Sequence, residues 1–138
     1  ALSKRTVGNS TQQANYFHAL RRQVRRNFRK PVIQMTPKSL LRHKACVSKL
    51  EEFGPGTSFH RVLWDNAQMQ GNLAADEDIR RVVLCSGKVY FDLEAERDAK
   101  GIKDVYIMRV EQIYPFPFHA VTTELSRFPN AEVIWLQE

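Results

Sequence analysis

The sequence RRVVLCSGKVYFDLEAERDAKGIKDVYIMRVEQI, residues 80–113, decides the fold class. An apolar run that ends in a glycine, residues 80–87, predicts a buried strand, and residues 88–101 have the apolar spacing of an amphipathic helix. Gly101 is a natural stop for that helix, and residues 104–113 form a second apolar run. Two strands separated by a helix of about 10 to 15 residues indicate a βαβ unit with parallel strands.

The alternation of helix and strand continues on both sides of this unit. Residues 114–129 predict a turn and a helix, and residues 131–138 predict a further strand. Upstream, residues 8–30 predict a helix and residues 32–36 a short strand. We therefore expect an α/β fold: a three-layer α/β/α sandwich of about five mostly parallel strands, with helices on both faces of the sheet.

The helix predicted over residues 8–30 is strongly basic. Ser10 and Gln13 have the spacing of a capping box at its start. Its apolar residues recur at helical spacing and predict the face that meets the core: Phe17, Leu20, Val24 and Phe28. Its cations are Arg21, Arg22, Arg25, Arg26, Arg29 and Lys30. We interpret them as a solvated face or a domain interface, with anion binding as the alternative. The nearby rings of Tyr16, Phe17 and Phe28 are expected in the core and not stacked on nucleic-acid bases.

Composition places the chain among globular proteins of one domain, residues 1–138. No run approaches the roughly 18 apolar residues of a membrane span, and the start has no secretory signal region. We expect an intracellular protein, cytoplasmic in a bacterium or in the mitochondrial matrix of a eukaryote. Cys46 and Cys85 have no disulfide or metal spacing and are expected to be reduced thiols. Residues 1–62 contain 13 basic and 2 acidic side chains, so this half could attract an anion.

Motifs for catalysis are missing from the sequence. It has no serine-hydrolase elbow, no dinucleotide-binding glycine pattern and no histidine spacing for zinc. The most suggestive local site is Ser86, Gly87 and Lys88, where a strand runs into a helix whose first amides could hold an anion. It is only half of a phosphate-binding loop, and a plain strand-to-helix turn is the competing interpretation.

Five separated blocks resemble one known family. They are ANYFHALRRQ at 14–23, RKPVIQMTPKSLLRHK at 29–44, RRVVLCSGKVYFDL at 80–93, RVEQIYPFP at 109–117 and NAEVIWLQE at 130–138. In this order and spacing they resemble the carboxyl-terminal domain of the first component of 2-oxoglutarate dehydrogenase. The string GPGTSFHRVLWD at 54–65 looks most like alphaproteobacterial and mitochondrial members.

The resemblance implies a fold and a parent activity. The implied fold is of the transketolase carboxyl-terminal type, with five strands including one antiparallel edge strand. The implied parent is a homodimeric enzyme of the citric acid cycle that decarboxylates 2-oxoglutarate on thiamine diphosphate and Mg²⁺. It passes succinyl to a lipoyl group on the second component of the complex. The family's thiamine-binding motif is not in this sequence, so we expect no cofactor and no activity from this piece. The family continues past Glu138, so we expect further domain elements beyond it.

Some actinobacterial relatives use this domain as a regulatory acetyl-coenzyme A pocket. Thr6, Arg22 and Gln112 match that pocket. Those relatives carry Lys, Ser, Arg and Arg at four positions that here are Ser58, Arg61, His119 and Ala120. Losing the arginine pair removes two-point phosphate contacts, so we predict that the regulatory site is weak or absent.

Two readings of the function follow. The first is a structural and interface domain packed against the rest of the parent chain, with residues 114–118 as part of its apolar contact face. It has no nucleic-acid or membrane partner. The alternative is a stand-alone α/β module that binds anions or nucleic acid through the basic helix, residues 21–30.

Overall fold

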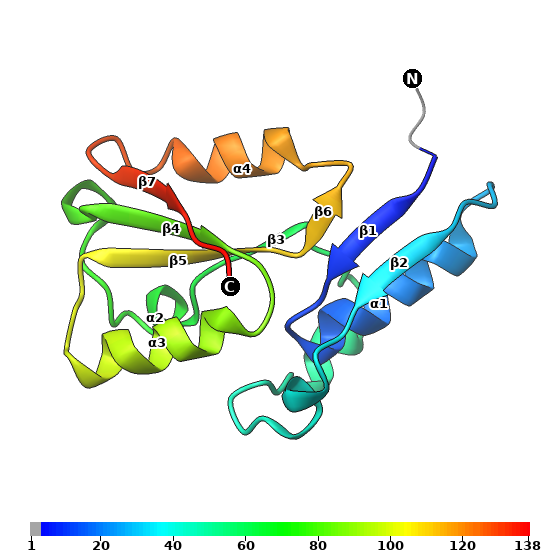
Figure 1. Cartoon of the computed structure of the whole chain (residues 1–138), viewed down its shortest axis with the longest axis horizontal. Coiled ribbons are helices and arrows are strands. Elements are labelled where there is room, and N and C mark those ends of the chain that lie inside the picture. Colours follow the sequence, from blue (N-terminus) through cyan, green and yellow to red (C-terminus); the bar gives the residue numbers. More distant parts are fainter. Residues whose placement is uncertain (1–3) are drawn as a thin grey trace.

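Two separate sheets make up the fold in the computed structural model, which describes residues 4–138 (Figure 1). The larger sheet contains, in spatial order, β3 (Val62–Leu63), β5 (Val105–Val110), β4 (Arg81–Cys85) and β7 (Glu132–Trp135). The smaller contains β2 (Val32–Met35), β1 (Thr6–Asn9) and β6 (Gln112–Tyr114). The α/β class is confirmed, but the strands divide between two mixed sheets where we expected one sheet of about five.

The predicted βαβ unit forms the centre of the larger sheet. β4 and β5 are parallel, and α3 (Val89–Ala99), which connects them, packs on β5. β7 is also parallel to β4, whereas β3 pairs antiparallel with β5 at the edge. An antiparallel edge strand is what the family resemblance implied. Figure 1 shows α3 and α4 (Phe118–Leu125) on opposite sides of this sheet.

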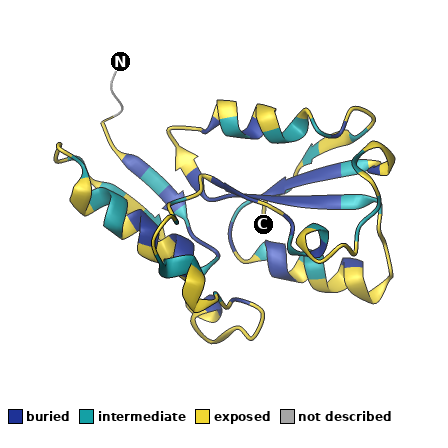
Figure 2. Cartoon of the chain, turned by 180° about the vertical axis from the view of Figure 1, so that it is seen from behind, coloured by how far each residue is buried: buried dark blue, intermediate teal, exposed yellow. Residues whose placement is uncertain are grey.

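Alternation along β4 and β5 divides the core between the two helices. Val82 and Met108, both fully buried, pack with Val121 of α4 in one apolar cluster. Cys85 and Ile107 pack on the other side with residues of α3. Successive side chains of a strand point to opposite faces, so the near-continuous apolar runs supply both clusters. Figure 2 shows these central strands as mostly buried.

The first helix is shorter than predicted and turned differently. α1 covers Gln13–Arg25, and the start of the predicted helix instead contributes to β1. The predicted apolar stripe is wrong, because its members are substantially exposed: Phe17 42%, Leu20 44%, Val24 78% and Phe28 43%. The buried face of α1 carries small and polar residues instead: Ala14, Asn15, His18 and Ala19.

Polar contacts explain which face of α1 is buried. Asn15 exchanges two hydrogen bonds with the backbone of His60, at 2.8 and 2.9 Å. A ring nitrogen of His18 lies 2.7 Å from the carbonyl oxygen of Glu52. These specific partners outweigh the apolar spacing, which leaves the larger side chains outside.

The start of α1 has no capping box. Gln12 is the N-cap residue and makes no side-chain cap bond, while the Ser10 hydroxyl accepts a hydrogen bond from Gln34. The backbone N–H of Thr11 instead points at the carboxylate of Glu111, about 100 residues away in sequence. Within the first turn, the N–H of Ala14 donates to the Ser48 hydroxyl at 3.0 Å, so an acceptor from elsewhere in the chain serves the start of α1.

Short elements lie in the connections from β2 to β3 and from β3 to β4. They are α2 (Asn66–Met69) and 3-10 helices at Lys38–Arg42, Leu50–Phe53 and Asp76–Asp78. Within residues 4–138, no helix has the length and apolar character needed to cross a membrane.

Candidate functional site

A cavity of about 310 Å³ brings together two of the predicted site residues, Thr6 of β1 and Gln112 of β6. β1 and β6 pair antiparallel, which places these residues near one wall. The Gln112 side chain donates a hydrogen bond of 2.8 Å to the carbonyl of Pro115. The lining is Thr6, Arg26, Phe28, Lys30, Arg61, Gln112, Pro115, Phe116 and Pro117. The cavity lining therefore combines basic side chains with apolar ones.

The electrostatics around this cavity favour an anion. Arg22, the third residue of the predicted pocket, stacks its guanidinium 4.0 Å from the ring centre of Phe59. Burial, and then the nearby charges of Arg26 and Arg61, lower the pKa of Arg22 to about 10. The group remains charged at neutral pH, but its charged form is disfavoured. An anion placed among these guanidinium groups would relieve that repulsion.

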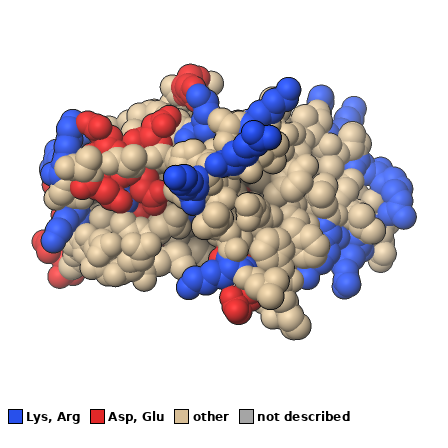
Figure 3. Space-filling model, turned by 90° about the horizontal axis from the view of Figure 1, so that it is seen from below, with Lys and Arg blue, Asp and Glu red and all other residues tan. Residues whose placement is uncertain are grey.

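Charge is unevenly spread over the molecule. Figure 3 shows one end with Lys and Arg and without visible Asp or Glu, while towards the other end Asp and Glu lie among further Lys and Arg. Exposed ion pairs such as Arg80–Asp104 and Arg81–Glu132 lie in the acidic half. In the basic half, the Glu52 carboxylate already accepts from Gln12 and from the backbone of Lys49. The asymmetry read from the sequence is thus also an asymmetry in space.

The turn at Ser86, Gly87 and Lys88 is formed as predicted, but its groups are engaged elsewhere. The Ser86 hydroxyl donates to the carbonyl of Val110 at 3.0 Å, and the Lys88 ammonium lies 2.6 Å from a Glu138 carboxylate oxygen. Gly87 has φ +82°, and a Cβ there would lie 2.6 Å from Asn9 Nδ2. None of the three lines the cavity. A tight turn in close contact with β1 accounts for them.

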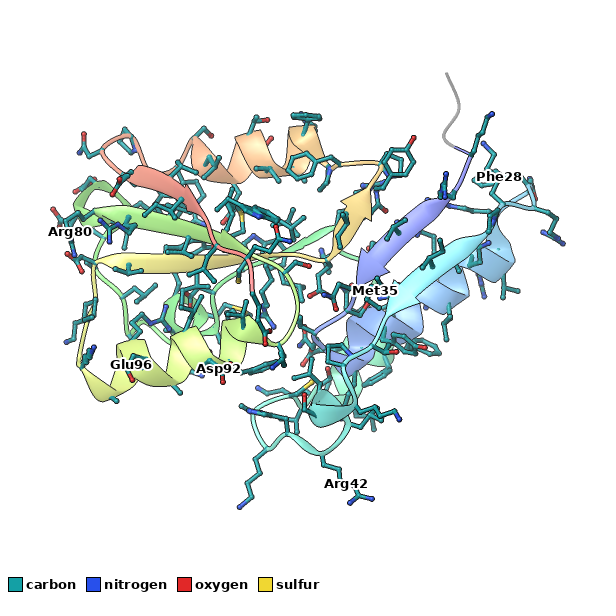
Figure 4. All side chains as sticks on the ribbon, in the orientation of Figure 1. Phe28, Met35, Arg42, Arg80, Asp92 and Glu96 are labelled. Atoms are coloured by element: carbon teal, nitrogen blue, oxygen red, sulfur yellow. The ribbon has the colours of Figure 1, made fainter. Side chains whose placement is uncertain are left out.

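The positions that differ from the acetyl-coenzyme A pocket are only partly at this cavity. Arg61 lines it, but Ser58, His119 and Ala120 are not among its lining residues. His119 and Ala120 lie in the first turn of α4. Figure 4 shows Phe28 at the connection between α1 and β2, near the end of the molecule.

The sequence analysis missed a set of buried charges: Asp65, Arg97, Arg109 and Glu111, each at most 3% exposed. Charged residues this deeply buried are nearly always paired. Asp65 pairs with Arg97, and Glu111 accepts hydrogen bonds from Thr11 and Asn15. One available signal was the charge of Arg109 and Glu111 inside the apolar run over residues 104–113.

The side chains that could bind a metal do not form a cluster in the described part of the chain. No group of three or more His, Cys, Asp or Glu side chains that could hold a metal occurs within residues 4–138. Figure 4 shows Asp92 and Glu96 on the outer side of α3, and Glu96 pairs with Lys100 at 2.8 Å.

Comparison with known proteins agrees with the sequence blocks. The family profile described as "2-oxoglutarate dehydrogenase C-terminal" matches residues 47–138. Two proteins named 2-oxoglutarate dehydrogenase E1 component, from Brucella anthropi and Brucella ovis, are 61% and 60% identical to this chain over 136 residues. The match covers 96% of this chain but 14% of the length of each relative. The chain therefore belongs to the 2-oxoglutarate dehydrogenase C-terminal family and corresponds to the C-terminal domain of an E1 component.

Proposed function

We propose that this chain, residues 1–138, is a structural and interface domain within a longer E1 component and supplies no catalytic group. The proposed parent oxidatively decarboxylates 2-oxoglutarate on thiamine diphosphate and Mg²⁺, and transfers succinyl to a lipoyl group on the second component of the complex. It acts as a homodimer in the bacterial cytoplasm. The carrying observation is 61% identity over a match that spans only 14% of a named E1 relative. We also propose that the domain has a transketolase-type sandwich fold, which further sequence of the parent chain completes.

An exposed aromatic surface supports an interface role. Tyr114, Phe116 and Phe118 are 48%, 36% and 71% exposed, and the rings of Phe116 and Phe118 meet edge to face at 4.8 Å. Ile113 beside them is also exposed. Contiguous apolar surface of this kind usually marks a contact with another protein part. We therefore assign residues 113–118 to the contact with the remainder of the parent chain.

A chimera tests this proposal. The matching segment of the Brucella anthropi E1 component is replaced by this chain, and 2-oxoglutarate decarboxylation and dimer formation are measured. We expect activity close to that of the unaltered enzyme, and loss of both properties when the segment is deleted. A chimera with Phe116→Ser and Phe118→Ser serves as the matched interface variant, and its weaker contact with the rest of the parent chain should lower its thermal unfolding temperature. A folded, dimeric chimera with no activity would contradict a purely structural role.

The cavity supports a second candidate, anion binding at Thr6 and Gln112, with Arg22 near the basic side chains although it is not among the lining residues. Arg26 and Arg61 add the positive charge that the pKa shift of Arg22 reports. We propose that this charge attracts small anions but that acetyl-coenzyme A binds weakly or not at all. The prediction is that titration calorimetry of acetyl-coenzyme A shows no saturation at micromolar concentration. Saturable binding that disappears in Arg22→Ala would overturn it.

The stand-alone nucleic-acid module is less well supported. Tyr16 and Phe17 on α1 are exposed, so the prediction that their rings lie in the core is wrong. The Phe17 ring nevertheless already contacts the rings of His18 and Phe53. A nucleic-acid ligand would show affinity that falls steeply with salt, by about one log unit of slope per phosphate contact. The structural proposal expects no such binding.

A further inference from the structure

The chain crosses between its two sheets three times, and two of these crossings are adjacent. We call residues 4–61 together with β6 the basic lobe, and residues 62–110 together with residues 118–138 the sheet lobe. The adjacent crossings are Arg61 to Val62 and Val110 to Glu111, and the third is formed by residues 115–117 between β6 and α4. Val62 and Val110 are direct partners in the β3–β5 pair, and the N–H of Glu111 donates to the carbonyl of Arg61 at 2.9 Å. Figure 1 shows the two lobes side by side, with β6 beside β1 at the boundary with the sheet lobe.

The carboxylate of Glu111 lies at this crossing and is completely buried. The backbone N–H of Thr11 is 3.1 Å from both of its oxygens, and the Thr11 hydroxyl also donates to it. The side-chain amide of Asn15 donates to it at 3.0 Å. All three donors lie in the basic lobe, two on Thr11 just before α1 and one on Asn15 in its first turn. An ionised carboxylate suits this place because it only accepts hydrogen bonds.

Arg109 continues the network into the sheet lobe. Two residues before Glu111, it donates from Nη2 to the carbonyl of Trp64 at 3.1 Å and to the side chain of Asn66 at 3.2 Å. Its guanidinium lies 4.0 Å from the ring centre of Tyr90. Nη1 reaches back to the Thr11 hydroxyl at 3.4 Å. Arg109 and Glu111 together therefore connect the start of α1 with β3, α2 and α3.

Apolar packing contributes only part of the junction. Leu40 and Cys46 from the basic lobe join a cluster with Tyr90 and Phe91 of α3. The other apolar cluster contains side chains of the sheet lobe alone. Burial raises the pKa of Glu111, while the charge of Arg109 and the bonds from Thr11 and Asn15 lower it. The junction thus depends on a costly buried charge kept by specific donors.

We propose that Glu111 is a conformational latch that fixes the basic lobe against the sheet lobe, and that releasing it lets the basic lobe move at the paired crossings. Replacing Glu111 with glutamine keeps the shape but points an amide at groups that are themselves donors. Glutamine offers one acceptor oxygen where the carboxylate offers two, so Thr11 and Asn15 then compete for a single acceptor, while both sheets keep their own pairing. The latch predicts local loosening and not general unfolding.

Hydrogen exchange measured by mass spectrometry on the natural full-length chain tests this. In Glu111→Gln we expect exchange faster by about tenfold or more over residues 6–25. Residues 81–110 should exchange at an unchanged rate. The matched control is Asp65→Asn, which alters an equally buried carboxylate whose bonds stay within the sheet lobe. It should accelerate exchange mainly in β5 and α3.

Three results would overturn the latch. They are no acceleration in Glu111→Gln, equal acceleration in both lobes, or equal acceleration of residues 6–25 by Asp65→Asn. If Glu111→Gln does not fold, Thr11→Val decides by the same criteria. That variant removes one donor to the carboxylate at a position only 1% exposed and keeps the backbone N–H.

Discussion

Replacing Asp65 with alanine is expected to lower the free energy of unfolding by about 3–5 kcal/mol. Asp65 is fully buried and forms an ion pair with Arg97, itself 3% exposed. Its carboxylate also accepts the backbone N–H of Ile107 at 2.7 Å and that of Ala67 at 2.9 Å. The variant leaves a buried guanidinium and two amides without their acceptor. Those groups then bear the full cost of desolvation.

Arg97 offers its own control, because it touches a second carboxylate. Asp98 lies 3.2 Å from Arg97 Nε but is 61% exposed, so Asp98→Ala should cost less than about 1 kcal/mol. The assay is urea unfolding followed by circular dichroism. With a slope of about 2 kcal/mol per molar, Asp65→Ala should lower the midpoint by about 2 M. Adding Arg97→Met should restore part of the loss, since it removes the uncompensated charge. Equal effects of the two aspartate variants would refute this reasoning.

Further predictions concern a thiol, an apolar surface and a turn. Burial raises the pKa of the Cys85 thiol to about 12, so at pH 8 the thiol is almost wholly protonated. It should therefore not react with a thiol reagent until the chain is unfolded. Rapid reaction of Cys85 in the native chain would contradict this. Phe116→Ser combined with Phe118→Ser should raise the solubility of the isolated chain, and unchanged or lower solubility would place these rings in the core. Gly87→Ala should destabilise by about 1–3 kcal/mol, and more than Gly101→Ala in thermal unfolding, because both have positive φ but only Gly87 meets a neighbour; equal costs would show that the contact with Asn9 is unimportant.

Periodicity predicted the elements whose environment is uniform. β4, α3 and β5 lie within the predicted ranges, because buried parallel strands and the helix between them follow the local apolar pattern closely. β7 also lies within its predicted range, although it is a mostly exposed edge strand. The basic helix shows where that approach fails. Phe17 and Leu20 have ideal core spacing yet are exposed, because Asn15 and His18 find polar partners on the opposite face. No local signal reveals partners that lie far along the chain.

The candidate site was predicted in part. Thr6 and Gln112 came from the family resemblance, and the structure places both at one cavity. The α1 cations were visible in the sequence, but the role of Arg61 beside them needed the fold. Glu111 is the clearest omission, since its partners Thr11 and Asn15 are about 100 residues away. The acid Glu111 beside the apolar strand indicates a buried charge in the sequence, but the sequence does not identify its hydrogen-bond partners.

The length of the native chain and the proteins that co-purify with it test most directly whether this domain is part of a longer E1 component. An antibody against this domain is used on extracts of the source cells, and the proteins that co-purify with the captured chain are identified and tested for 2-oxoglutarate decarboxylation. The account predicts a native chain several times longer than 138 residues. The captured chain should decarboxylate 2-oxoglutarate and co-purify with a lipoyl-bearing succinyltransferase. A native chain of about this length, without either companion, would contradict it and make the basic helix the leading clue to function.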